Sequence, residues 1–223
     1  MKLHPLTAKI IFTFESNLED ELAIGMKKYM RDKFDYLGIK SPTRAELLKP
    51  FFPEFKKLDE KEWMLVVEQL WNQKFREFQY AAMELCRKKT KAFEPDHLSF
   101  LEKMITEKSW WDSVDMVASN LLGTYFKRYP EKIPGALSRC TKSDNFWLHR
   151  TCIIFQLKYG DNTDQKLLFE LCAKYSKEKE FFIRKAIGWA LRQYSKYNPK
   201  AVAGFIQKQK LSPLSVKEGS KYL

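Results

Sequence analysis

Four helical blocks, each led by a bulky aromatic residue, recur along the chain at an almost constant spacing. They open at Phe75, Trp110, Phe146 and Phe182, so that successive starts lie 35, 36 and 36 residues apart. Each block continues as an apolar stripe at three- and four-residue steps, and further amphipathic stretches, such as 96–105 and 164–175, lie between blocks. One helix pair per unit at this period predicts a right-handed α-solenoid of HEAT-like helix pairs with a basic concave face.

Composition agrees with a chain made of packed helices. Among 223 residues only 8 are Gly and 9 are Pro, and no alternating strand pattern stands out. Hydrophobic residues make up 44% of the chain, which is enough for a sizeable core and excludes a disordered chain. We therefore expect an all-α fold in a single domain over residues 1–223.

Three sequence signals mark helix starts. Asp59 and Glu62 have the spacing of a capping box at the beginning of an amphipathic stretch. Ser41 precedes a proline and is an expected N-cap. Ser215 and Glu218 repeat the capping-box spacing near the end of the sequence.

The net charge of +12 points to a polyanionic partner, either nucleic acid or an acidic membrane surface. A merely soluble basic protein is the alternative, because net charge alone does not show a patch. If the solenoid is curved, basic residues of the block helices converge on its inner face, which fits a duplex better than a flat bilayer. These residues are Arg76, Arg150, Lys158, Arg184, Lys185 and Arg192.

Several other classes of protein find no support. No apolar run approaches the length of a membrane span, and the start of the chain lacks a secretory cleavage signal. The four cysteines form no C-x-x-C pair and the three histidines show no metal-ligand spacing, so we expect no metal and no cofactor. Reduced thiols buried in helices fit a cytoplasmic protein of bacterial type, associated with the nucleoid through DNA.

The segment KSWWDSVD, residues 108–115, places two acids beside two tryptophans. Trp110 is expected to be a core residue and Asp112 a first-turn acid favoured by the helix dipole. Asp115 follows Trp111 by one helical turn, and a carboxylate beside an indole is costly to desolvate unless it has a cationic partner. A structural and a functional role for this second pair both remain open at this point.

Two further aromatic segments carry basic residues. In NFWLHR, Arg150 follows Phe146 by four residues, and it could be an exposed salt-bridge residue or an arginine held for bidentate phosphate recognition. His149 is expected to be an ordinary surface or packing histidine. In EFFIRKAIGWALRQY, Trp189 follows Gly188, where a small residue would let a ligand or a neighbouring backbone approach.

Taken in order, seven segments resemble the DNA alkylation repair family of AlkD-type glycosylases over nearly the whole chain. They are 26–44, 76–82, 108–115, 143–150, 155–160, 180–194 and 211–218. The resemblance implies a HEAT-like solenoid whose basic concave face grips duplex DNA. It also implies hydrolysis of the N-glycosidic bond of N3- and N7-alkylated purines, with the lesion kept in or near the base stack. We expect a monomer, since repeat solenoids of this length can act as monomers.

The resemblance also implies roles for individual residues. The catalytic acid is Asp115, the two site tryptophans are Trp111 and Trp189, and the arginine that grips the DNA backbone is Arg150. Further DNA contacts are implied at Tyr29, Lys40, Lys158 and Arg192. The match at the core positions argues against an inactive relative, although a binding-only solenoid or a protein-interaction scaffold stays open as the alternative.

The implied chemistry answers why a basic protein would place an acid beside tryptophans. An alkylated purine is cationic and leaves readily, and positive charge moves onto the deoxyribose as the bond stretches. A carboxylate at Asp115 would stabilise that charge, and the indole faces would attract it as well. Arg150 would fix the nucleotide through its phosphate. No protonation of the base is needed.

Overall fold

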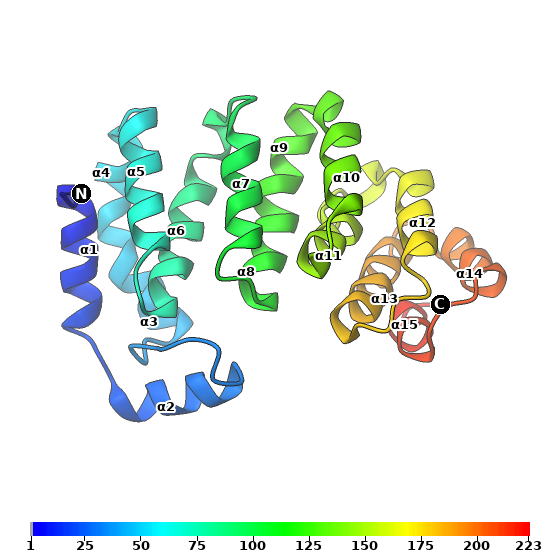
Figure 1. Ribbon diagram of the computed structural model, residues 1–223, viewed down its shortest axis with the longest axis horizontal. Helices are drawn as coiled ribbons and strands as arrows, with labels where there is room; N and C mark the ends of the chain where they lie inside the picture. The colour runs from blue at the N-terminus through cyan, green and yellow to red at the C-terminus, as the bar shows by residue number, and fades with distance from the viewer. Residues whose placement is uncertain (1) are drawn as a thin grey trace. The chain divides into compact units, whose positions relative to one another are not determined.

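A computed structural model describes residues 2–223, and over these residues it contains helices and connecting segments but no β-strand (Figure 1). The prediction of an all-α fold is confirmed. The chain divides between Ala92 and Phe93 into two compact units, each with its own core. A single domain over residues 1–223 stays a prediction.

The first unit is built around α5 and α6, which pack against each other and against the helices that precede them. Helix α1 contributes Leu6, Ile10 and Phe14, all fully buried, at the three- and four-residue steps that align side chains on one face. The Phe14 ring stacks on Phe78 of α6 with 5.6 Å between the ring centroids. The elements are α1 (Pro5–Glu15), α2 (Asp20–Tyr29), α3 (Ser41–Leu48), η1 (Lys49–Phe51), α4 (Phe52–Lys57), α5 (Glu60–Trp71), α6 (Arg76–Lys88) and η2 (Thr90–Ala92).

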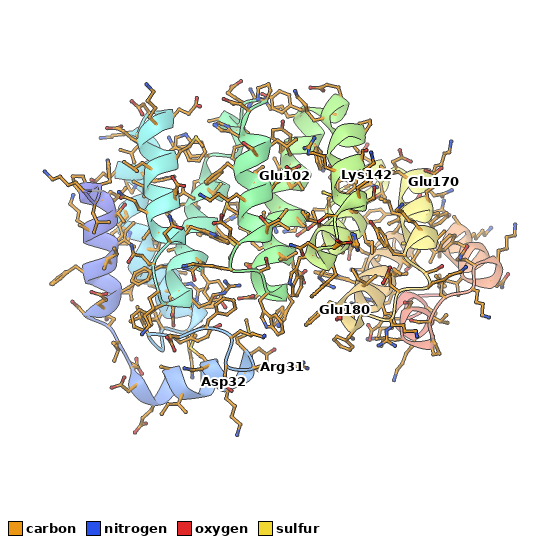
Figure 2. The ribbon with its side chains drawn as sticks, in the orientation of Figure 1. Arg31, Asp32, Glu102, Lys142, Glu170 and Glu180 are labelled. Carbon is orange, nitrogen blue, oxygen red and sulfur yellow. The ribbon has the colours of Figure 1, made fainter. Side chains whose placement is uncertain are left out.

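The loop between α2 and α3 is held by a buried carboxylate. Glu77 accepts hydrogen bonds from the backbone N–H groups of Leu37, Gly38 and Ile39 at 3.0 to 3.2 Å. Gly38 has a φ of +88°, and a Cβ there would lie 2.1 Å from a backbone oxygen, so only glycine fits. At the end of α2, Arg31 and Asp32 also adopt positive φ values and lie in the turn labelled in Figure 2.

The second unit consists of successive helix pairs. Helix α11 packs against both α8 and α13, so the helices that open the aromatic blocks are neighbours. An ion pair of 2.6 Å from Arg139 of α10 to Glu102 of α7 links two of the intervening helices. Of the two residues, Glu102 is labelled in Figure 2. The elements are α7 (His97–Thr106), α8 (Trp111–Met116), η3 (Val117–Leu122), α9 (Gly123–Arg128), η4 (Pro130–Lys132), α10 (Ile133–Lys142), α11 (Phe146–Ile154), η5 (Gly160–Asn162), α12 (Gln165–Lys174), α13 (Phe181–Ser195), α14 (Pro199–Lys208) and α15 (Pro213–Gly219).

The capping signals are confirmed at one helix and shifted at two others. Asp59 forms the expected capping box at the start of α5. Ser41 is the first residue of α3 rather than its N-cap, which is Lys40. At α15 the cap is Ser212, three residues before the expected Ser215, because Ser215 Oγ instead donates to the Arg184 carbonyl of α13. A tertiary partner therefore decides the role of Ser215.

Helix α15 lies along α13 (Figure 1). The contact depends on Gly188, where an added Cβ would lie 2.5 Å from the Glu218 Cβ and 3.0 Å from the Ser215 carbonyl oxygen. The small residue before Trp189 thus admits a neighbouring helix.

The four cysteines are buried free thiols, as expected. Among the described residues, no helix is both long and apolar enough to cross a membrane.

Candidate active site

Asp115 lies in the last turn of α8, just before a stretch of π-helix. Helices α8, η3 and α9 follow one another without a break, and η3 is the π-helical part of this longer helix. Ser119 Oγ donates a hydrogen bond of 2.6 Å to the Asp115 carbonyl oxygen. Because π-helical segments widen the helix by an extra residue and often occur at functional sites, this irregularity marks the surroundings of Asp115.

The segment that leads into α8 has an unusual backbone. Lys108 has a φ of +50°, a value that residues other than glycine rarely adopt. Ser109 Oγ then donates a hydrogen bond of 2.6 Å to the Ile105 carbonyl oxygen at the end of α7. This sharp turn sets the point at which Trp110 and Trp111 enter α8.

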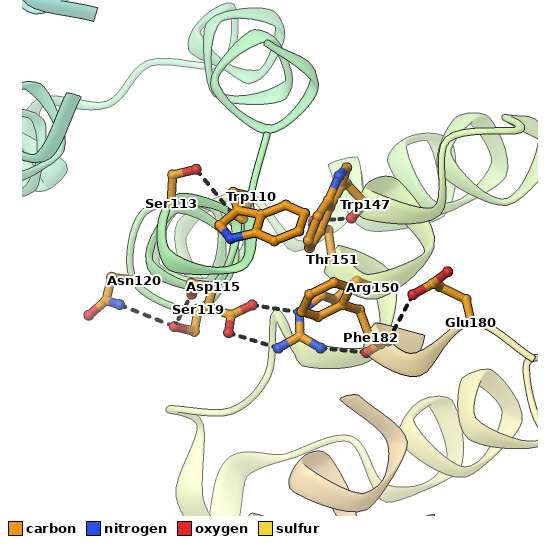
Figure 3. A network of polar contacts seen from close by, with 10 residues as sticks. All are labelled: Trp110, Ser113, Asp115, Ser119, Asn120, Trp147, Arg150, Thr151, Glu180 and Phe182. Carbon is orange, nitrogen blue, oxygen red and sulfur yellow. Dashed lines mark hydrogen bonds and ion pairs between the residues drawn. The ribbon is translucent and has the colours of Figure 1, made fainter. Parts of the chain in front are cut away.

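A bidentate ion pair joins Asp115 to Arg150 of α11 (Figure 3). The Nε of Arg150 donates to Asp115 Oδ1 at 2.6 Å, and an NH2 donates to Oδ2 at 2.7 Å. A third donor of Arg150 reaches the Phe182 carbonyl oxygen of α13 at 2.5 Å. The pair therefore ties three consecutive block helices together at one point.

Burial of the pair is unequal and leaves the acid accessible. The Arg150 side chain is 5% exposed and the Asp115 side chain 16%. Of the roughly four lone-pair positions on a carboxylate, Arg150 occupies two, so Asp115 can still accept hydrogen bonds. Arg150 is thus not the exposed salt-bridge residue that one interpretation of the sequence suggested.

Burial raises the pKa of Asp115 above its ordinary value, while the hydrogen bonds and charge of Arg150 act in the opposite direction. Asp112, in the first turn of the same helix, adds a smaller contribution that also raises the pKa of Asp115. The arginine is therefore the group that favours the ionised form of an otherwise desolvated acid.

Aromatic rings surround the ion pair. Trp110 makes edge-on contacts with Trp147 and Phe182, at centroid distances of 5.7 and 5.2 Å (Figure 3). The guanidinium of Arg150 lies 6.0 Å from the centre of the Trp189 ring. Trp111 begins α8, one turn before Asp115. The predicted gathering of the block starts is confirmed for Trp110, Trp147, Phe182, Arg150 and Trp189. Trp110 packs against two rings but is only partly buried, so it is not the core residue that was expected.

The other predicted residues lie in different settings. Lys158 Nζ donates to Asn120 Oδ1 of η3 at 2.5 Å, and Arg192 pairs with Glu218 of α15. Tyr29 and Lys40 are exposed residues of the first unit. The roles of these four residues in DNA binding stay predictions.

His149 stacks on Tyr175 at 4.8 Å and bonds the Ser143 carbonyl oxygen, as expected of a packing residue.

Sequence reasoning did not foresee that Arg150 is the partner of Asp115. A signal existed, since the two residues occupy places that differ by one residue in consecutive blocks, the sixth residue of one block and the fifth of the next. The phosphate contact assigned to Arg150 stays a prediction. The structure is compatible with it, because two of the five N–H donors of Arg150 are not used in the bonds to Asp115 and Phe182.

The fold consists of helix pairs, and Asp115 is ion-paired with Arg150 among aromatic rings in a basic chain. These features place the protein in the class of helical-repeat proteins. The sequence model of the DNA alkylation repair enzyme family matches residues 10–223, and the chain belongs to this family.

Solved structures agree with this membership. A protein of Enterococcus faecalis described as "Predicted DNA alkylation repair enzyme" is 33% identical with a TM-score of 0.86, over 92% of this chain and 96% of that one. The structures of smu.31 and of AlkD2, both from Streptococcus mutans, are each 19% identical over 81% of this chain and 97% of theirs, with TM-scores of 0.62 and 0.61. The last two show a shared fold. No curated protein matches the chain.

Proposed function

We propose that the protein is a DNA glycosylase that hydrolyses the N-glycosidic bond of cationic N3- and N7-alkylated purines in duplex DNA. The observation that carries the proposal is the Asp115–Arg150 pair. It presents a partly exposed carboxylate one turn from Trp111, and its arginine lies 6.0 Å from the centre of the Trp189 ring, in a member of the DNA alkylation repair enzyme family.

Asp115 would act as an electrostatic stabiliser. The bond from the sugar C1′ to the purine nitrogen breaks, both electrons leave with the base, and the cationic lesion departs as a neutral purine. Positive charge on the deoxyribose then faces the Asp115 carboxylate, which is preorganised by Arg150 and works in a partly dry site where charges interact more strongly than in water. Water adds to C1′ and loses a proton, and a free lone pair of Asp115 can orient that water.

Trp111 and Trp189 would supply the aromatic faces that attract the cationic lesion and sugar. Arg150 would have two tasks, namely to hold Asp115 in position and to direct a remaining N–H toward the neighbouring phosphate.

The decisive experiment measures release of free base from a duplex that contains one 7-methylguanine, under single-turnover conditions. Asp115→Asn should release base roughly 10² to 10³ times more slowly than the wild type, the scale found when one preorganised electrostatic group is removed. Its affinity for the duplex should remain. Asp112→Asn removes a nearby charge from the same helix and should release base at close to the wild-type rate.

Two results would contradict the proposal. Equal rates for Asp115→Asn and the wild type would remove Asp115 from its role. Tight DNA binding without base release by the wild type, on either 7-methylguanine or 3-methyladenine, would identify a protein that only binds DNA.

A further inference from the structure

A cluster of three cations surrounds one carboxylate where α15 packs against α13. Glu218 of α15 lies 2.9 Å from Lys185 Nζ and 3.1 Å from Lys221 Nζ, and it also pairs with Arg192. We call these four residues the Glu218 cluster. The carboxylate is largely buried, whereas the side chains of Lys185, Arg192 and Lys221 are 39%, 23% and 47% exposed.

The cluster carries a surplus of positive charge. One carboxylate neutralises one of the three cations, so two positive charges remain. Within residues 2–223, the structure gives the three cations no second acidic partner. Each ammonium has three donors and the guanidinium five, and each group uses only part of its capacity on Glu218. A salt bridge that served only to attach α15 would need one cation.

Glu218 keeps the cations in place over a wide pH range. The hydrogen bonds from Lys185 and Lys221 lower the pKa of Glu218 to about 2. The carboxylate is therefore ionised at neutral pH and holds three like charges close together. Without it they would repel one another, which means that the arrangement is preorganised before any anion arrives.

The cluster lies on the same side of α13 as the site tryptophan. Lys185, Trp189 and Arg192 follow one another at four- and three-residue steps, so they share one face of the helix. Near the beginning of the same helix, the Phe182 carbonyl accepts a hydrogen bond from Arg150. Along this face Trp189 therefore lies between two cations of the Glu218 cluster, Lys185 and Arg192.

We propose that the Glu218 cluster is a binding site for a phosphate of the DNA backbone close to the lesion. In it Lys185 and Lys221 contact the phosphate together with Arg192, whose DNA contact the family resemblance already implies, and Glu218 is a positioning residue. This inference rests on the proposed function for its ligand, since two surplus charges suit a phosphodiester group. It assigns the Lys185–Arg192 stretch of α13 and the end of α15 to substrate positioning beside Trp189.

The test uses an undamaged duplex, so that it does not depend on catalysis. We would measure the dissociation constant over a series of salt concentrations for Lys185→Gln, Arg192→Gln and Lys221→Gln. Each variant should bind about 3 to 10 times more weakly, and the slope of log affinity against log salt should shrink by about 0.9 for a lost phosphate contact. Lys166→Gln is the matched control, because Lys166 of α12 is 87% exposed and pairs only loosely with Glu170 at 4.0 Å.

The Glu218→Gln variant tests whether Glu218 positions the three cations or has no part in DNA binding. Removal of a negative charge from a DNA-binding surface should by itself strengthen binding. If Glu218 organises the cations, the variant binds DNA more weakly although its net charge is higher. Stronger binding by Glu218→Gln would overturn its positioning role. Circular dichroism establishes that each variant is folded at the temperature of the measurement.

The outcomes separate this inference from the proposed function. If the three cation variants bind as tightly as Lys166→Gln, with unchanged salt slopes, the cluster only attaches α15 and the inference is wrong, whatever the wild type does to methylated DNA. If the variants lose affinity but the wild type releases no base, the phosphate site stands and the glycosylase proposal fails.

Discussion

At the scale of single residues, the Asp115–Arg150 pair holds the carboxylate of Asp115 in a fixed position and contributes little to the stability of the fold. Desolvation of two charges costs several kcal/mol per ion, and their attraction repays this only with good geometry. Here both carboxylate oxygens and three guanidinium nitrogens are bonded. Loss of one partner would leave the other charge buried and uncompensated.

The proposed role of this pair predicts how the rate of base release depends on pH. In the proposed mechanism Asp115 acts as a carboxylate, so base release should fall as the pH drops through its raised pKa. Arg150 is the group that opposes this rise, and Arg150→Gln should therefore move the acidic fall in rate to higher pH as well as lower the maximum. Single-turnover rates measured from acidic to neutral pH would show the shift.

Arg150→Lys provides the control, because it keeps the charge and loses the planar fork. It should shift the acidic fall less than Arg150→Gln does. Superimposable pH profiles for the wild type and Arg150→Gln, after scaling, would contradict the assignment of the acidic fall to Asp115.

Sequence reasoning reached Asp115 and the tryptophans but not the contacts between helices. The spacing of Trp111 and Asp115 follows from helical periodicity alone. The bond from Arg150 to Asp115 follows only if nearly equivalent positions of consecutive repeats are assumed to be in contact. The cation cluster around Glu218 was missed, since Lys185 and Glu218 lie far apart in the sequence and Glu218 looked like a capping residue.

At the scale of elements, the docking of α15 on α13 rests on one small residue. Gly188 lies where an added Cβ would come within 2.5 Å of the Glu218 Cβ, well inside normal contact distance. By contrast, a Cβ at Gly204 of α14 would meet nothing within 4 Å. These two glycines occupy helix interiors of the same unit, so they form a matched pair.

We predict opposite effects for the two substitutions. Gly188→Ala should destabilise the protein by about 1 to 3 kcal/mol, because overpacking forces α13 and α15 apart. Gly204→Ala should stabilise it by about 0.5 to 1 kcal/mol through the higher helix propensity of alanine. Urea denaturation followed by circular dichroism measures both. Equal stability for Gly188→Ala and the wild type would show that α15 is held elsewhere.

The leading aromatic residues of the four blocks predicted helix starts well. The aromatic residues Phe75, Trp110, Phe146 and Phe182 all lie at or within one residue of a helix start. The loop between α2 and α3 was not predictable, because its shape depends on a carboxylate of α6 that captures three N–H groups. The π-helical η3 has no local sequence signature at all.

At the scale of the whole molecule, the net charge of +12 favours electrostatic attraction to a polyanion such as DNA. If phosphate contacts dominate, binding releases condensed counterions and weakens steeply with salt. We predict a loss of about 10³-fold or more in duplex affinity between 50 and 200 mM salt, on the order expected for six or more phosphate contacts. Fluorescence anisotropy with a labelled duplex measures this. An affinity that does not respond to salt would favour the protein-scaffold alternative.

The repeat spacing predicted the all-helical architecture because each unit of helix pairs must bury its apolar stripe against the next. It did not predict the division into two compact units at Ala92 and Phe93. The aromatic period continues across this point without interruption, so periodicity carries no sign of a boundary.

The widened turn of η3 fixes the aim of the carboxylate that precedes it. An α-helix advances by about 100° per residue, since it has 3.6 residues per turn. If Val117–Leu122 formed a regular α-helix without a change in chain length, the register would shift by about one residue and Asp115 would turn by about that angle relative to α9. The acid would then face away from Arg150 while every functional side chain was still present. The π-helical winding of this short stretch therefore matters to the site as much as the identity of the acid itself.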